Sequence, residues 1–558
     1  MKTTENFAQA LAKKFQQMQN DRRRLEPTWA ILSALCLPNR NGKFKNSSPA
    51  SRHHTTHYLD DIYDSTGAQS ADYLTATLMG GLATKTLKWF HLIPNEFSQN
   101  TTVTAQELEL DLRTNFMLKY LANPKSGFYT ALAEATMETV VLGTGILECY
   151  YEPAEGIKYR AISLESCYIT TDYHGQVDTV FRYYAMTARQ LLQQWGENKD
   201  FPKEFKYKCE QNLYEPVEVI RAVIPNSEYD EGKTDKYKFK SVYFLKDFDY
   251  ILEETLLDYF PFVVPRWSKD ADEDYGYSPA RTCQADMETI QAMSMSNLQA
   301  RQMAQNPMQL ATDDGSFTID SIQPGNIIFG ALDAITGKPK LTPQITGINP
   351  TVLDPELEQR REAVRRTFFN NQLIQQNRPQ MTAEEVSTLR EENLRALSPS
   401  VLRYIDEVLY PLIVKTYHLL TKHKLFPPTI SENATAMFKD YEVDVEFDSP
   451  LANTTKMADF QAFSRYFQTF LLPMAQTDPT IVDTLNMSRA AYMNAHNLGV
   501  PLQILNTPEE AAAIKQGRQQ AQQSQFQLQA QDIQSKAMLE QQKINAVNNL
   551  KANEDGVL

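Results

Sequence analysis

The sequence lacks the features that direct a chain into or across a membrane. No apolar run approaches the roughly 20 residues that a helix needs to span a bilayer. The first 20 residues are polar and amphipathic, without the apolar core of a secretion signal. Only five cysteines are present, with no CxxC pair and no even framework, which predicts reduced thiols. We therefore expect a soluble protein made in the cytoplasm.

Positive charge is also in short supply. The 558 residues carry a net charge of −14, whereas a protein that wraps DNA tightly is usually basic, because phosphate neutralisation supplies its affinity. This balance argues against a sequence-reading DNA binder but allows a protein past which DNA slides. The chain is 42% hydrophobic and 22% charged, as in globular proteins, and is long enough for about two to four cores.

The glycine-rich segments do not complete a nucleotide-binding motif. Gly80–Thr86 lacks the glycine before lysine that lets backbone amides cradle a phosphate. Gly143-Thr144-Gly145 lacks the third glycine and the preceding strand of a dinucleotide site, and is expected to turn a helix into a strand. No GxSxG signature is present.

Two groups of side chains are weak metal candidates. Asp270, Asp272 and Asp274 match the first half of a calcium loop, but Tyr275 replaces the turn glycine and Arg281 replaces the bidentate glutamate. A second candidate is a histidine group on a segment that reads as a loop: His53, His54 and His57. We therefore expect no catalytic residue, no metal and no cofactor.

The first half of the chain is predicted as helices followed by a β-rich stretch. Apolar spacing indicates helices over residues 5 to about 35, Tyr63–Lys88 and 104–145. The charged run Asp21–Arg24 is expected on a solvated helix face rather than on phosphate. Strands are predicted from aromatic and β-branched residues at Ile146–Tyr151, Tyr159–Ser163, Cys167–Thr171, Val177–Ala185, Val217–Ile224, Phe239–Phe244 and Phe262–Trp267.

The second half is predicted as mainly helical. Ser278 as N-cap and Pro279 at the first position start a helix that runs to about Gln305, and Asp354-Pro355 starts another. Pro399 and Pro411 should kink or restart a later helix. Further expectations are a half-buried strand over Tyr441–Asp448, helices over 451–505, and a Gln-rich tail that is either an assembly-dependent helix or disordered.

Several short motifs follow one another over most of the chain: Tyr63–Gly67, Leu78–Leu82, Trp89-Phe90, Val141–Gly145, Tyr275–Pro279, Met381–Val386, Leu397–Pro399, Leu409–Ile413 and Phe447–Ala452. Each motif is weak alone, but their order and spacing are specific. In this order and spacing the chain resembles the portal, or head-to-tail connector, proteins of short-tailed bacteriophages.

The resemblance implies an α+β, mainly helical fold: a portal-type protomer with a β-rich wing, a helical stem, a small clip and a helical crown, assembled into a dodecameric ring. By position, residues 1–275 correspond to the wing and 276–350 to stem and clip. Residues 351–450 correspond to the channel loop, a long kinked helix and a returning wing strand. Residues 451–505 resemble crown helices, and 506–558 form the Gln-rich tail.

The resemblance also implies partners and a virion location at one capsid vertex. Double-stranded DNA would pass through the channel without sequence preference, and the terminase motor, tail adaptors, scaffold and coat proteins would dock. The segment that resembles the channel loop carries Gln375, Gln376, Asn377, Arg378 and Gln380. The neutral amides there would form weak hydrogen bonds with passing phosphates and release them quickly, while Arg378 would either hold DNA or pair with a neighbouring acid.

The helix that begins at Asp354 carries four arginines that could bridge subunits or face DNA, and we expect pairing with acids of neighbouring subunits: Arg360, Arg361, Arg365 and Arg366. Two alternatives to a portal remain open at this stage. One is a metal-dependent hydrolase that uses the aspartate or histidine groups above. The other is a helical tail or internal virion protein, suggested by the Gln-rich terminus.

Overall fold

The computed structural model describes most of the chain in separate stretches. They are residues 4–37, 44, 49, 62–85, 87–94, 103–197, 203–226, 237–245, 250–305, 309–311, 332, 335–343, 354–370, 399–427, 443–447, 463–471, 473–474 and 508–554. The chain forms two compact units. The first contains Met1–Phe90, Asn115–Ser431 and Ser449–Ala452, and the second contains His91–Thr114, Glu432–Asp448 and Asn453–Leu558.

A five-stranded antiparallel sheet forms one part of the first unit. Its strand order is β4 (Cys167–Thr171), β5 (Val177–Thr187), β6 (Pro216–Pro225), β7 (Phe239–Leu245) and β8 (Tyr250–Leu257). Consecutive strand residues point to opposite faces. One face therefore carries Phe181, Ile220 and Phe244, and the other carries Val219 and Leu245.

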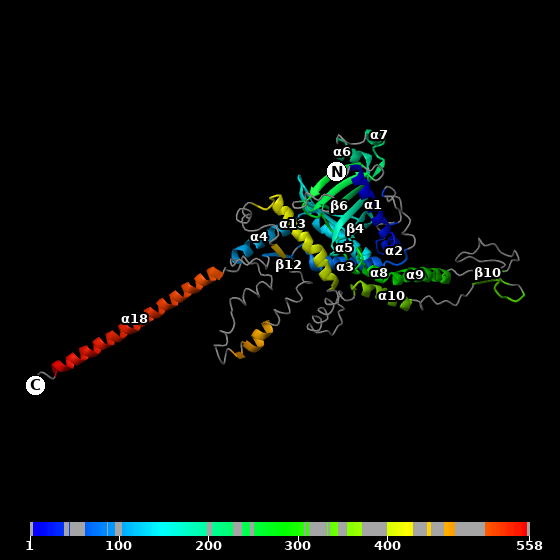
Figure 1. Ribbon diagram of the computed structural model, residues 1–558. Coiled ribbons are helices and arrows are strands. Elements are labelled where there is room, and N and C mark those ends of the chain that lie inside the picture. Colours follow the sequence, from blue (N-terminus) through cyan, green and yellow to red (C-terminus); the bar gives the residue numbers. More distant parts are fainter. Residues whose placement is uncertain are drawn as a thin grey trace. The chain divides into compact units, whose positions relative to one another are not determined.

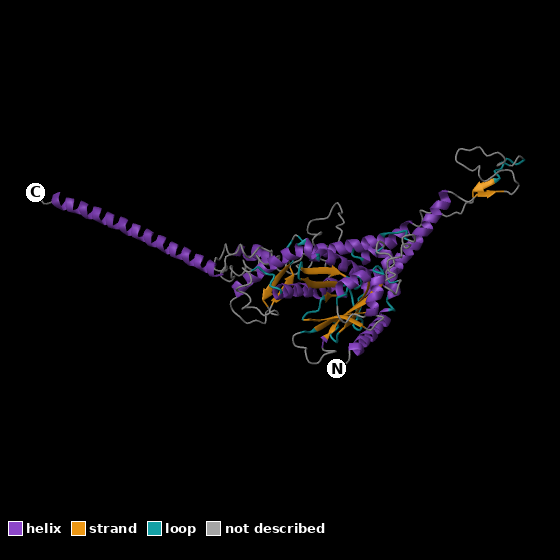
Figure 2. Cartoon of the chain, turned by 90° about the horizontal axis from the view of Figure 1, so that it is seen from above, coloured by secondary structure: helices purple, strands orange, loops and turns teal. Residues whose placement is uncertain are grey.

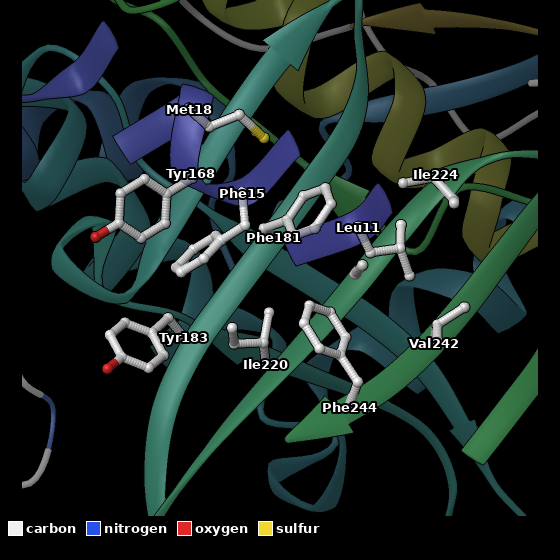
Figure 3. Packing of buried hydrophobic residues seen from close by; sticks show 11 residues of the cluster. Leu11, Phe15, Met18, Tyr168, Phe181, Tyr183, Ile220, Ile224, Val242 and Phe244 are labelled. Atoms are coloured by element: carbon white, nitrogen blue, oxygen red, sulfur yellow. The ribbon is translucent and has the colours of Figure 1, made fainter. Parts of the chain in front are cut away.

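Helices cover both faces of this sheet. Leu11, Phe15 and Met18 of α1 (Thr4–Arg22) pack into the first face, where the Phe15 ring lies 5.0 Å from that of Tyr168 (Figures 1 and 3). α6 (Ala188–Trp195) and α7 (Lys203–Gln211) pack onto the opposite face through a second buried cluster. Burial on both sides explains why the strands are rich in apolar and aromatic residues.

A smaller sheet and a group of helices complete the first unit. The sheet has the order β3 (Gly156–Ala161), β2 (Leu147–Glu152), β9 (Phe262–Val263), with α13 (Tyr410–Lys422) against β2 and β3. The packed helices are α2 (Glu26–Cys36), α3 (Thr66–Leu82), α5 (Phe128–Leu142), α8 (Pro279–Thr282), α9 (Gln284–Gln305) and α10 (Asp354–Thr367). Short helical turns occur at Pro124–Ser126 and Leu164–Ser166, and a π-helix at Ile405–Leu409.

Two further strand pairs join distant parts of the sequence. β10 (Gln309–Ala311) pairs antiparallel with β11 (Leu341–Pro343) in the first unit. In the second unit, β1 (Phe90–Pro94) pairs with β12 (Val443–Phe447). α4 (Val103–Ala122) contributes residues to both units, and a second π-helix spans Phe467–Leu471.

The second unit also contains α18 (Pro508–Glu554), an uninterrupted helix of 47 residues (Figure 2). The Gln-rich tail is therefore a helix. Its described side chains are exposed, including Ile514, Leu528, Ile533, Met538, Leu539 and Ile544. In the described part of the chain, no helix combines the length and apolarity that crossing a membrane requires.

Most predicted elements are confirmed, with corrections to three helices and to the β-rich stretch. The single helix expected over residues 5–35 is wrong, because α1 ends at Arg22 and α2 begins at Glu26 with Pro27 in its first turn. The helix expected over 104–145 is likewise divided into α4 and α5, and the helix expected from Pro279 to about Gln305 into α8 and α9. The expected strand Phe262–Trp267 extends only to Val263. The elements α6, α7 and β8 were not predicted. All five cysteines are free and buried, as expected.

The charged run Asp21–Arg24 is solvated at three of its four positions. Arg22, however, is only 2% exposed. Its guanidinium donates to Glu26 Oε1 at 2.7 and 2.9 Å and to the carbonyls of Leu164 and Cys167, and it stacks on the Tyr168 ring. Arg22 therefore fastens α1 to the sheet, so the expectation of a solvated face is wrong for this residue.

Candidate functional site

The four arginines of α10 all form ion pairs within the chain. The strongest is Arg361, whose Nη2 and Nε donate to Asp64 Oδ2 at 2.6 and 2.9 Å. Asp64 has a side chain only 5% exposed. Its burial raises the pKa of Asp64, but hydrogen bonds from Thr66 and Arg361 outweigh that effect and hold the pKa below its usual value. Arg361 therefore fixes α10 to the start of α3.

The other three arginines differ in exposure and partner. Arg360 donates to Asp286 of α9 at 3.1 Å, and Arg365 donates to Glu358 of its own helix at 2.6 Å. The Arg366 side chain is 73% exposed and lies 3.8 Å from Glu362. These intrachain pairs leave the expected pairing between subunits as a prediction, for which Arg366 is the most accessible candidate.

α9 and α10 are joined at the end where the chain leaves one and enters the other. Arg301, near the end of α9, donates to both oxygens of Asp354 at 2.8 and 2.9 Å, and Asn297 donates to the same carboxylate. Asp354 is the first residue of α10. Residues 306–353, which include the β10–β11 pair, therefore depart from and return to one end of the helix pair.

The predicted channel residues Gln375, Gln376, Asn377, Arg378 and Gln380 lie outside the described residues, as does the matching segment Met381–Val386 that follows them. The structure does describe the chain on both sides of this segment. α10 ends at Thr367 and the described chain continues to Asn370 before it, and helical residues are described again from residue 399 after it. At the predicted kink or restart, the π-helix Ile405–Leu409 ends just before α13, which begins at Tyr410 with Pro411 in its first turn.

Two of the segments that carry the resemblance meet in space. Gly143 ends α5 with φ +89°, and a Cβ there would lie 2.3 Å from the carbonyl oxygen of Gly276. Thr144 Oγ1 accepts a hydrogen bond from Gly276 N at 2.8 Å. The close backbone approach explains both glycines. The expected helix-to-strand turn at Gly143–Gly145 is confirmed, since β2 begins at Leu147.

The phosphate-loop candidate is the end of a helix. α3 includes Gly80 and continues to Leu82, and Thr84 Oγ1 donates to the Gly80 carbonyl. The amides of both glycines, Gly80 and Gly81, are thus part of a helix rather than of an open cradle.

The acidic stretch around Asp274 joins elements of the fold. Asp274 Oδ1 accepts from Thr171 Oγ1 at 2.5 Å at the end of β4, and Glu273 pairs with Arg24 at 3.0 Å. Among the described residues, no group of three or more acidic, cysteine or histidine side chains is placed to hold a metal. His53, His54 and His57 lie outside the described part of the chain.

Sequence reasoning missed two buried charged groups in the first unit. Glu148 on β2 pairs with Arg160 at 2.6 Å and with Arg221 on β6, which ties the two sheets together. Lys415 on α13 donates to the Phe262 carbonyl at 2.5 Å, and burial lowers the pKa of Lys415 to about 8. Both groups join segments that are far apart in sequence, so no local pattern marks them.

Comparison with known proteins agrees with this arrangement. The sequence pattern of the family described as bacteriophage head to tail connecting protein matches residues 8–505. The chain is 26% identical over 528 residues to the portal protein of Salmonella phage epsilon15, and the aligned region covers 92% of this chain and 91% of that protein. It is also 26% identical over 526 residues to the probable portal protein of Bordetella phage BPP-1, with the same coverage. The family pattern matches nearly the whole length of the chain, the fold mixes helices and sheets, and two of the matching segments contact each other at Gly143 and Gly276. This chain belongs to the bacteriophage head-to-tail connecting proteins.

Proposed function

We propose that the protein is the portal of a short-tailed phage, a ring of twelve chains at one capsid vertex through which DNA is packaged, retained and ejected. The observation that carries this proposal is the family match over residues 8–505, which covers nearly the whole chain before the tail helix. The relatives named as portal proteins are matched over nine-tenths of their own length. The packaging motor, tail adaptors, scaffold and coat proteins are the proposed partners.

The α9–α10 pair supports the assignment of residues 276–350 to stem and clip. A stem must carry the chain outward and bring it back, with a small domain at its tip. Arg301, Asn297 and Asp354 join the helices at the end from which residues 306–353 depart, and β10 pairs with β11 within that excursion. We assign residues 1–275 to the wing by the same order.

Charge and exposure support an assembled ring. The net charge of −14 per chain is repeated in every subunit, and an acidic surface repels phosphate and limits sticking during passage. α18 exposes six large apolar side chains along 47 residues, and helices of this kind gain stability by packing against one another. Residues 375–380 are proposed to line the channel.

The other functions gain little from the structure. A metal-dependent hydrolase would need the acids of residues 270–274 free to bind a metal, whereas Glu273 and Asp274 are engaged by Arg24 and Thr171. A tail or internal virion protein was suggested by the Gln-rich terminus alone, and the family match lies in the rest of the chain.

Negative-stain microscopy and native mass measurement of the complete chain test the proposal. We expect rings with a central hole and one dominant subunit number. A double variant, Arg365→Glu and Arg366→Glu, should scatter ring assembly if these side chains meet acids of a neighbouring subunit. Reversing the exposed Arg23 of the first unit serves as the control for a change of charge. Compact monomers under all conditions would contradict the portal function, and intact rings in the double variant would contradict the role of the two arginines alone.

A further inference from the structure

The dipeptide Arg266-Trp267 contacts the chain on both sides of residues 371–398. Trp267 lies against Phe369, near the end of the stretch described before that segment, with ring centroids 6.5 Å apart. Arg266 pairs with Glu407 in the helix described after it. Two neighbouring residues thus hold two stretches that the sequence separates by nearly 40 positions.

The contact with the second stretch is a buried, bidentate ion pair. The Arg266 side chain is 5% exposed, and its Nε and Nη2 donate to Oε2 and Oε1 of Glu407 at 3.1 and 2.9 Å. The backbone amide of Arg266 donates to the same carboxylate at 3.1 Å. Paired N–H donors of this kind fix orientation as well as distance. Glu407 is therefore held in one position relative to the Arg266 backbone.

The same guanidinium extends the connection to the β4–β5 hairpin. Nη2 also donates to the Gly175 carbonyl at 3.0 Å, in the turn between these strands, and Nη1 approaches the Asp274 carbonyl at 3.4 Å. The main chain around Arg266 is itself fixed, since the Trp267 amide donates to Gly143 O at 2.9 Å. Arg266 and Trp267, which we call the anchor, are thus bonded to the chain between α5 and β2.

The backbone around Glu407 departs from a regular helix. Ile405–Leu409 forms a π-helical turn, and Pro411 follows it. Proline has no amide hydrogen, so the carbonyl of Glu407, four residues earlier, receives no helical bond from Pro411. Single π turns are frequent at functional positions. This one lies where the helix meets Arg266.

The contact with the first stretch occurs at a strained residue. Phe369 has φ +59°, a conformation that aromatic residues rarely adopt, and its amide donates to the Arg366 carbonyl at 2.9 Å. Its neighbour Phe368 is fully buried. Such a backbone persists only where the surroundings determine it. Trp267, 7% exposed, supplies a wall at this point.

We propose that Arg266 and Trp267 hold the chain on both sides of residues 371–398, the segment that contains the proposed channel residues, at one point of the wing. They are positioning residues, which fix where this segment starts and ends relative to the DNA that passes. This inference rests on the proposed function, in which residues 375–380, within this segment, line the channel. It assigns a role to four described residues: Arg266, Trp267, Phe369 and Glu407. It requires that a substitution in the chain on one side of residues 371–398 also alter the chain on the other side.

Hydrogen exchange in the complete chain tests the transmission. Glu407→Gln keeps the shape of the side chain and removes its charge, while Phe369→Leu keeps an apolar contact and removes the ring. We expect Glu407→Gln to speed amide exchange about tenfold in residues 399–409 and also in residues 364–370. Combining the two substitutions should give an effect that is not the sum of the single effects, because both act on the same anchor.

Glu26→Gln is the matched control. Glu26 also accepts two bonds from a buried arginine, Arg22, which likewise donates to backbone carbonyls, here those of Leu164, Glu165 and Cys167. Its loss should speed exchange near α1 and leave residues 364–370 and 399–409 unchanged. If Glu407→Gln proves unstable, Trp267→Phe is a milder variant that should loosen residues 364–370 first. Exchange confined to residues 399–409, with additive double-variant effects, would overturn the inference.

Phage particles assembled with each variant test the consequence for DNA. We expect rings of normal subunit number in Glu407→Gln and Glu26→Gln, but a severalfold smaller fraction of DNA-filled heads in Glu407→Gln only. Normal rings with normal DNA content in Glu407→Gln would refute the positioning role and leave the portal function intact. Failure of the unaltered protein to form rings would instead contradict the portal function, while the exchange experiment still decides whether the anchor exists.

Discussion

The pair formed by Asp64 and Arg361 gives the most direct test of how α10 is held. Arg361→Met removes the two bonds of 2.6 and 2.9 Å and leaves a carboxylate that is 5% exposed, with the amide and the side chain of Thr66 still bonded to it. Breaking a fully buried pair costs about 3–5 kcal/mol. Because Arg361 is itself 30% exposed, water recovers part of this loss. We therefore expect the free energy of unfolding to fall by about 2 kcal/mol.

The same pair predicts a pH dependence with a definite sign. The pKa of Asp64 is lowered in the folded chain, so its contribution is present above the unfolded pKa of about 4 and is lost as pH falls through the folded value. The stability gap between the unaltered chain and Arg361→Met should therefore narrow steadily below about pH 4.

Urea unfolding followed by tryptophan fluorescence, at fixed protein concentration, measures both effects. Arg366→Met is the matched control on the same helix, since its side chain is 73% exposed and 3.8 Å from Glu362. It should change stability by less than about 0.5 kcal/mol. If Arg361→Met proved as mild as this control at pH 7, Asp64 and Arg361 would not hold α10 as the structure indicates.

Two further substitutions probe buried groups of the first unit. Burial lowers the pKa of Lys415 to about 8, so its charged form destabilises the folded state below pH 8, and this destabilisation fades as the pH rises towards the pKa of an unfolded lysine near 10. Lys415→Met should therefore raise the melting temperature at pH 7. In unfolding experiments from pH 7 to 10, the stability advantage of Lys415→Met over the unaltered chain should shrink by up to about 3 kcal/mol. Gly143→Ala should lower the free energy of unfolding by more than about 3 kcal/mol, because the added Cβ would lie 2.3 Å from Gly276 O at a φ of +89°. Gly80→Ala in α3 is the control and should stabilise the chain slightly, since a Cβ there has no atom within 4 Å. Equal thermal stability of the two variants would refute the close approach of Gly143 and Gly276.

Local patterns predicted the elements whose signals lie within a few residues. Cys167–Thr171 was predicted with its observed bounds because its apolar and β-branched residues belong to a sheet buried on both faces. Ser278 was recognised as a cap, and its hydroxyl does accept from the Arg281 amide. α6 was missed although Thr187 and Gln190 form a reciprocal capping box, a signal that was readable in the sequence.

The contacts that hold the site could not be predicted in the same way. Arg22 looks like any solvated arginine of an amphipathic helix, and only the carbonyls of residues 164–167 make it a buried anchor. Arg266 and Glu407 lie 141 positions apart, and neither belongs to a motif. The spacing of charges along a chain predicts neighbours on one helix face, but not which distant carboxylate will meet an arginine once the chain folds.

The pairing of β1 with β12 has a consequence for synthesis on the ribosome. About 350 residues separate Pro94 from Val443, so β1 leaves the exit tunnel long before its partner strand is translated. At about 5–20 residues per second the delay is roughly 20–70 s, during which most of the first unit is completed while β1 has no partner strand. The nascent chain therefore carries an open strand edge for much of its production, and this pairing must await the final quarter of the message.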